Sequence, residues 1–104
     1  MQLSTLNYMP NMQITQHFGI VNGSTVRSKH AGRDIMASFK NLFGGELKGY
    51  TELLEESREE AIKRMVDQAK KLGANTVLNV RFSTSAVASG AAEIYVYGTA
   101  VFAQ

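Results

Sequence analysis

Residues 50–80 read YTELLEESREEAIKRMVDQAKKLGANTVLNV, and they specify the central elements of the fold. Apolar side chains recur at helical spacing as far as Leu72, and Gly73 follows at once. Acidic side chains fill the first half and basic ones the second half, an order that complements the helix macrodipole. From Thr76 onward the residues become β-branched and alternate. The stretch therefore predicts a helix from residue 50 or 51 to Leu72, a left-handed glycine cap at Gly73, and a strand beginning at Thr76.

The buried side of this helix follows from the same spacing. Five side chains recur at intervals of three, four or seven residues and form one apolar stripe. We expect this stripe to pack against a sheet, and its members are Leu54, Ala61, Met65, Ala69 and Leu72.

Upstream, two further elements are expected. Residues 34–43 carry apolar side chains at helical spacing and predict a short helix that Gly44-Gly45 stops. From Gln13 the pattern alternates and predicts a strand, which Asn22-Gly23-Ser24 ends as a turn. Residues 2–5 can form a short strand.

Downstream, the chain predicts a hairpin. Residues 76–84 and 91–102 alternate as strands, and residues 85–90 are small and predict the loop between them. We expect the helix-facing side of the sheet to hold Ile14, Phe18, Ile20, Leu78, Val80, Phe82, Ile94, Val96 and Phe102. The opposite side is expected to hold Thr15, His17, Val21, Val77, Asn79, Arg81, Glu93, Tyr95 and Tyr97. Tyrosines on a face of this kind are typical of protein–protein interfaces.

Together these elements predict an α+β fold. We expect a small antiparallel-rich sheet with two helices packed on one face, in the order β-α-α-β-β. With 104 residues, 44% of them apolar and 19% charged, the chain is a single soluble domain over residues 1–104.

Composition excludes several classes of function. The net charge is only +2, and the long helix mixes both signs, so a nucleic-acid partner is not expected. The chain has no cysteine, which removes disulfides and thiolate metal ligands. It lacks the charged and apolar regions of a signal peptide and any run near the ~20 apolar residues of a membrane helix. We expect a cytoplasmic protein with no membrane partner and no cofactor.

Several short motifs, taken together, resemble the YbjQ-like family of small bacterial proteins. They are Arg33-Asp34, residues 41–45 (NLFGG), Tyr50, Arg58, Ala61, residues 73–77 (GANTV) and residues 98–101 (GTAV). The resemblance covers nearly the whole chain. It implies an α+β subunit that assembles as a homo-oligomeric ring, a pentamer in known members. The family is labelled as heavy-metal-binding, and a selenium-binding relative is similar to it. Thiol groups are the obvious basis for such binding, and this chain has none.

Candidate site residues fall into two groups. Arg33, Tyr50 and Arg58 are the best donors for an anionic ligand, although an Arg–carboxylate lock between the helices is the first interpretation of them. His17 and His30 are the only histidines and are weak metal candidates, because two histidines alone do not complete a zinc site. If a site exists, we expect it between subunits or beside Gly44-Gly45.

The sequence thus favours a small homo-oligomeric protein, a pentamer by resemblance, with a role in binding or assembly rather than catalysis. Its ligand is not identified by the sequence. The alternative is a metal- or metalloid-binding protein, and a third possibility is an enzyme with a site between subunits.

Overall fold

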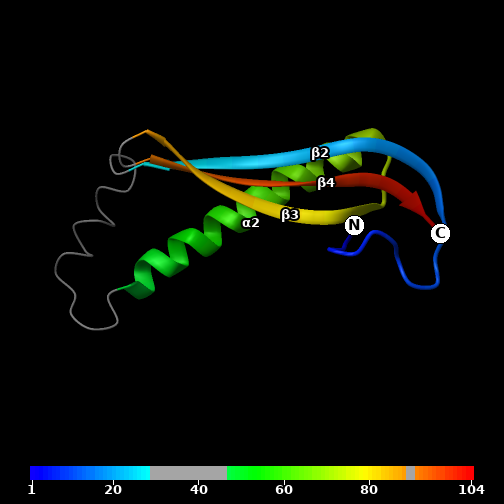
Figure 1. The fold of residues 1–104 in the computed structure, drawn as a ribbon, viewed down its shortest axis with the longest axis horizontal. Helices are drawn as coiled ribbons and strands as arrows, with labels where there is room; N and C mark the ends of the chain where they lie inside the picture. The colour runs from blue at the N-terminus through cyan, green and yellow to red at the C-terminus, as the bar shows by residue number, and fades with distance from the viewer. Residues whose placement is uncertain (29–46, 89–90) are drawn as a thin grey trace.

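The computed structural model describes residues 1–28, 47–88 and 91–104, which form a two-layer α+β domain (Figure 1). The elements are β1 (Gln2–Leu3), β2 (Ile14–Ser28), α2 (Leu47–Leu72), β3 (Thr76–Ala88) and β4 (Ala91–Ala103). They build a four-stranded sheet in the order β1-β3-β4-β2, in which β1 runs parallel to β3 and the other pairs are antiparallel. One face of this sheet is crossed by α2, mainly over β2 and β4.

The α+β class is confirmed, but the predicted arrangement of two helices in the order β-α-α-β-β is wrong. The described residues contain one helix, and their sheet is mixed because β1 adds a parallel edge strand of two residues. Neighbouring backbone hydrogen bonds extend this edge, with Ser4 N–H donating to Val77 O at 3.0 Å. The short helix predicted over residues 34–43 lies outside the described residues.

The long helix ends at Leu72 as predicted, but it begins at Leu47 rather than at residue 50 or 51. Ala61, Met65 and Ala69 are fully buried, and Leu54 packs partly buried against the same core, whereas Leu72 is 45% exposed. Gly73 has a φ of +93°. Its N–H donates to Lys70 O at 3.0 Å, and Ala74 N–H donates to Ala69 O at 3.1 Å. These two bonds make a Schellman motif, which satisfies carbonyls that the helix end would otherwise leave free.

The predicted turn at Asn22-Gly23-Ser24 is wrong, because β2 continues through it to Ser28. Gly23 allows α2 to pack closely against β2 and does not reverse the chain direction. A Cβ at this position would collide with the backbone of Ala61 and Met65, so the missing side chain lets α2 approach β2 closely. Side chains of α2 also bond the edge of this strand: Gln68 Oε1 accepts from Asn22 N–H, and Arg64 Nη1 donates to Ser24 O at 2.6 Å.

Bulges in β2 change which side chains face the core. The ladder to β4 shifts by one residue between His17 and Gly19, where Gly19 has a φ of +100°. A one-residue shift moves every later side chain to the other face. Val21 is therefore fully buried, and Ile20 is 76% exposed, the reverse of the prediction. A second shift between Ile14 and Gln16 accompanies an exposed Ile14, which was also expected in the core.

A bulge in β3 has the same effect. The ladder to β4 shifts between Leu78 and Arg81, and Asn79 inside the bulge has a φ of +53°. Val77, expected opposite the helix, is fully buried in the helix-side core, and Leu78 pairs with Thr99 on the far side. Val80 keeps its predicted place against the core.

The terminal hairpin is longer than predicted. β3 runs to Ala88 and pairs Ala88 with Ala91 of β4, so residues 85–88 are strand rather than loop. Along β4 the predicted alternation holds, with Ile94, Val96 and Ala100 buried on the helix side.

Candidate functional site

The side of the sheet away from α2 presents a continuous surface of paired side chains. In the register, Ile20, Asn22, Ser24 and Val26 of β2 lie opposite Thr99, Tyr97, Tyr95 and Glu93 of β4. Arg81, Ser83 and Ser85 of β3 complete the rows on the other flank of β4. We call these eleven residues the open face.

Large apolar side chains on the open face are exposed. Ile20 is 76%, Val26 53% and Tyr97 38% exposed. Tyr95 and Tyr97 lie along the centre of this surface, with ring centroids 5.6 Å apart and planes tilted by 30°. Serine, asparagine, tyrosine and arginine together with exposed aliphatic groups form a composition typical of protein–protein contact surfaces.

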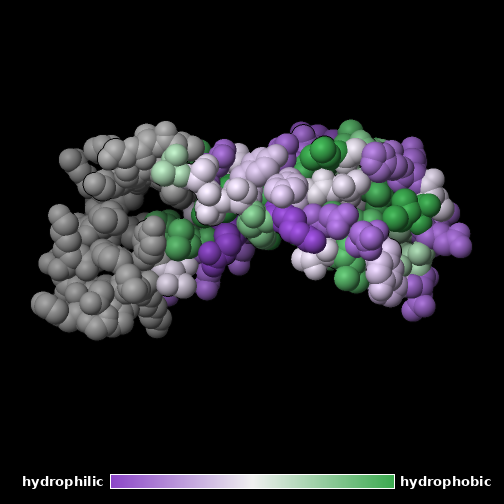
Figure 2. All heavy atoms as spheres, in the orientation of Figure 1, coloured by the Kyte–Doolittle hydropathy of each residue, from purple (hydrophilic) through white to green (hydrophobic). Residues whose placement is uncertain are grey.

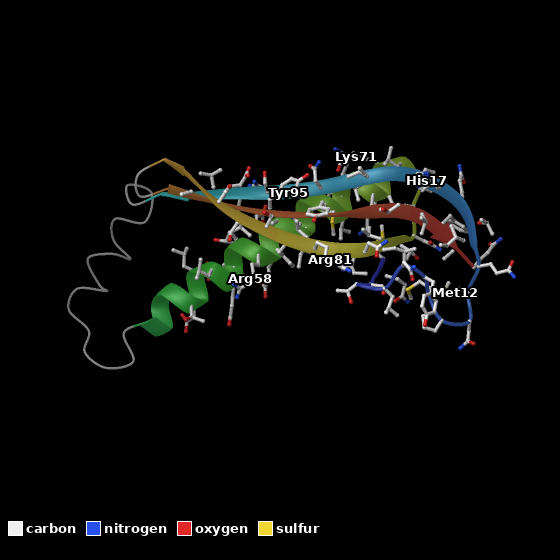
Figure 3. The ribbon with its side chains drawn as sticks, in the orientation of Figure 1. Met12, His17, Arg58, Lys71, Arg81 and Tyr95 are labelled. Atoms are coloured by element: carbon white, nitrogen blue, oxygen red, sulfur yellow. The ribbon has the colours of Figure 1, made fainter. Side chains whose placement is uncertain are left out.

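Arg81 is held in a fixed position on this surface. Its Nη1 donates to Thr5 O at 3.0 Å and to Val80 O at 2.9 Å. Tyr97 is its cross-strand partner. In Figure 3, Arg81 and Tyr95 both lie along the middle part of the sheet.

The segment bonded by Arg81 is the N-terminal arm, which we define as residues 1–13. It runs beside β3, where Asn79 N–H donates to Leu6 O at 2.9 Å and Val80 N–H to Ser4 O at 3.0 Å. Its last residue, Gln13, exchanges two backbone hydrogen bonds with Gln104. Four apolar side chains of the arm are exposed, namely Met1 (42%), Leu3 (40%), Leu6 (45%) and Tyr8 (53%).

The end of the sheet beside the arm is closed. Leu78, Val101 and Ala103 are each at most 3% exposed. Asn75 reinforces this end: its Nδ2 donates to Ala103 O at 2.7 Å, and its Oδ1 accepts from Ala103 N–H at 2.8 Å. The open face therefore begins beyond this closed end, at the Ile20–Thr99 pair.

Most of the predicted ligand-binding set lies beyond what the structure describes. Arg33 falls outside the described residues. Tyr50 lies in the first turn of α2, and its side chain is not among those that the structure describes. Arg58 is an exposed residue of α2, in the half of the helix away from the chain termini (Figure 3). The grouping of Arg33, Tyr50 and Arg58 stays a prediction.

Of the two metal candidates, His30 lies outside the described residues. His17 is exposed on β2, opposite Val101, at the end of the molecule that carries both termini (Figure 3). Within residues 1–28, 47–88 and 91–104, no three His, Cys, Asp or Glu side chains gather closely enough to hold a metal ion.

Several open-face residues were expected elsewhere. The sequence placed Ile20 in the core, Asn22 and Ser24 in a turn, and Ser85 in a loop, and it assigned no element to Val26, which follows the expected turn. Gly19 was the available signal, because a glycine inside a strand pattern often marks a bulge and therefore an inverted face.

In the part of the chain that the structure describes, no helix is both long and apolar enough to span a membrane.

Comparison with known proteins gives consistent matches over the full length. The whole chain, residues 1–104, matches the YbjQ family, described as "Putative heavy-metal-binding". A UPF0145 protein of Hahella chejuensis is 62% identical over 101 residues, covering 97% of each chain. A UPF0145 protein of Thermus thermophilus is 54% identical over 99 residues, covering 95% of this chain and 87% of that protein.

A solved structure shares the fold. The crystal structure of a protein of unknown function from Pediococcus pentosaceus, assigned to the DUF74 family, superposes with a TM-score of 0.65. It is 14% identical and covers 100% of this chain and 98% of that one. The full-length family match and these close relatives establish that the chain belongs to the YbjQ family, together with the UPF0145 proteins.

Proposed function

We propose that this protein is a homo-oligomeric assembly subunit, that its assembly is a ring of five, and that its role is binding rather than catalysis. The observation that carries the proposal is the exposure of Ile20, Val26 and Tyr97 on the open face. Monomeric proteins seldom leave a contiguous apolar and aromatic surface without a partner.

The shape of the subunit supports assembly. The Cα radius of gyration is 16.8 Å, whereas a compact chain of this length has roughly 13 Å. The strands account for much of this, because 15 residues of β2 extend over about 50 Å. A sheet this long, covered by one helix on one side, gains apolar burial when a second copy covers the other side. The ring of five rests on the resemblance to the YbjQ-like family.

Native mass spectrometry on the purified full chain tests the proposal. We expect a main species of five times the 11.4 kDa chain mass, and sedimentation at micromolar concentration should give the same mass. A monomer as the only species under both conditions would overturn the assembly. A different closed number of subunits would correct the ring size alone.

The family description gives a second candidate, a metal- or metalloid-binding function with donors from more than one subunit. His17 is the described side chain best suited to it, because it is exposed and close to the surfaces that an assembly would bring together. Elemental analysis of the purified ring tests this candidate. A stoichiometric metal that the variant His17→Gln loses would support it, and a metal-free ring that binds no added metal would exclude it.

A further inference from the structure

We infer that the contact between neighbouring subunits is head-to-tail, with the N-terminal arm of one copy seated on the open face of the next. The inference rests on the proposed assembly and identifies the two surfaces that build it.

The first argument is the distribution of exposed apolar side chains. Among the described residues, ten large apolar side chains are exposed. Four of them belong to the arm and three to the open face, so most of this surface is concentrated in two places. Figure 2 shows hydrophobic residues interspersed with hydrophilic ones at the end of the molecule that carries the termini. A single contact that joins the two surfaces removes both from water.

The second argument is symmetry. A two-fold contact uses the same patch on both partners, whereas a cyclic ring needs two different patches that fit each other. A ring of five therefore cannot be built from open-face-to-open-face contacts alone. The arm and the open face are two different exposed apolar patches on one chain.

The third argument is charge. Residues 1–13 contain no Asp, Glu, Lys, Arg or His. Among the open-face residues only Arg81 and Glu93 are charged. The arm can thus cover Ile20, Tyr97 and their neighbours without burying a charged side chain of its own, which avoids a large desolvation cost. The outer surface of α2 is less suited to cover the open face, because it would bury charged side chains. These are Glu52, Glu55, Glu59 and Lys63.

The fourth argument is preorganisation. The arm backbone is already bonded to β3 through Ser4 and Leu6, and Arg81 holds Thr5. Its exposed side chains are presented from a fixed backbone, so little chain entropy is lost when a neighbour binds.

Two variants of the full chain test the inference. Leu6→Lys places a charge on the arm, and Ile20→Lys places one on the open face; both sites are exposed, at 45% and 76%. Leu72→Lys, also 45% exposed but outside both surfaces, is the matched control. We expect each surface variant to be monomeric and the control to keep the ring. Circular dichroism checks the folding of each, and Tyr8→Ser and Val26→Lys replace a variant that does not fold.

The decisive measurement is a mixture. The arm variant keeps an intact open face, and the open-face variant keeps an intact arm. Mixed in equal amounts, with one of them isotopically labelled, they should form heterodimers and no rings in native mass spectrometry. If the wild-type protein forms a ring, either of two results would overturn the head-to-tail contact. They are an arm variant that still assembles and a mixture that stays monomeric. A monomeric wild type would instead overturn the proposed assembly itself.

Discussion

Gly23 sets the distance between the two layers of this protein. At this position α2 lies so close to β2 that a Cβ would meet the backbone of Ala61 and Met65 rather than a movable side chain. A clash with backbone cannot be relieved by a rotamer change, so the helix or the strand has to shift.

We therefore predict that Gly23→Ala lowers the free energy of unfolding by about 1–3 kcal/mol, the usual range for overpacking. Urea unfolding at fixed protein concentration measures this change. Gln16→Ala is the matched control, because Gln16 is an exposed residue of the same strand outside both the open face and the N-terminal arm, and its replacement should have little effect. Equal stability of the two variants would show that the layers are not in contact here.

At the scale of elements, the helix and the last strand were predictable for a clear reason. The periodicity from Thr51 to Leu72 and along β4 is uninterrupted, and Gly73 marks the helix end unambiguously. In β2 and β3 each bulge inserts one residue into an alternating pattern, at Gly19 and Asn79. The residues before and after each bulge alternate regularly, so the alternation alone does not reveal the inversion between them. In β2 the glycine at position 19 was the available sign of it.

The edges of the elements were less predictable for a related reason. Gly23 and the small residues 85–88 are typical of turns, yet tertiary contacts keep both inside strands. Of the candidate functional surface, Tyr95, Tyr97, Arg81 and Glu93 were expected on the face away from the helix and lie there. Ile20 and Val26 were not expected there, because their exposure depends on the bulge.

The packing of α2 leads to a prediction at this scale. Met65 is fully buried, so Met65→Asp buries an unpaired charge and should cost several kcal/mol. Leu72, at 45% exposure, is the comparison, and Leu72→Gln should change the melting temperature by only about a degree or two. Thermal unfolding followed by circular dichroism separates the two. A Met65→Asp variant as stable as Leu72→Gln would contradict the helix register.

At the level of the whole molecule, the family is described as heavy-metal-binding, but this subunit has no thiol group to act as a metal ligand. We predict that a subunit held monomeric by Ile20→Lys binds zinc no more tightly than micromolar, because a few exposed histidine and carboxylate ligands form an open, incomplete set. Calorimetry on metal-free protein gives the affinity. Nanomolar one-to-one binding by the monomer would contradict this and place a complete site within one chain.

The bulges also constrain how a chain of this kind can change over time. Those at Gly19 and Asn79 lie at nearly the same level of the sheet, on either side of β4 at Ala100 and Thr99. Deleting one residue there exchanges the inner and outer surfaces of the strand beyond it, exposing Val21 and burying Ile20. Substitutions can accumulate one at a time along the open face. A change of length at either bulge, in contrast, requires that the residues that follow it in the strand are substituted at the same time. Insertions and deletions are therefore far less accessible routes of divergence at these two positions than replacements.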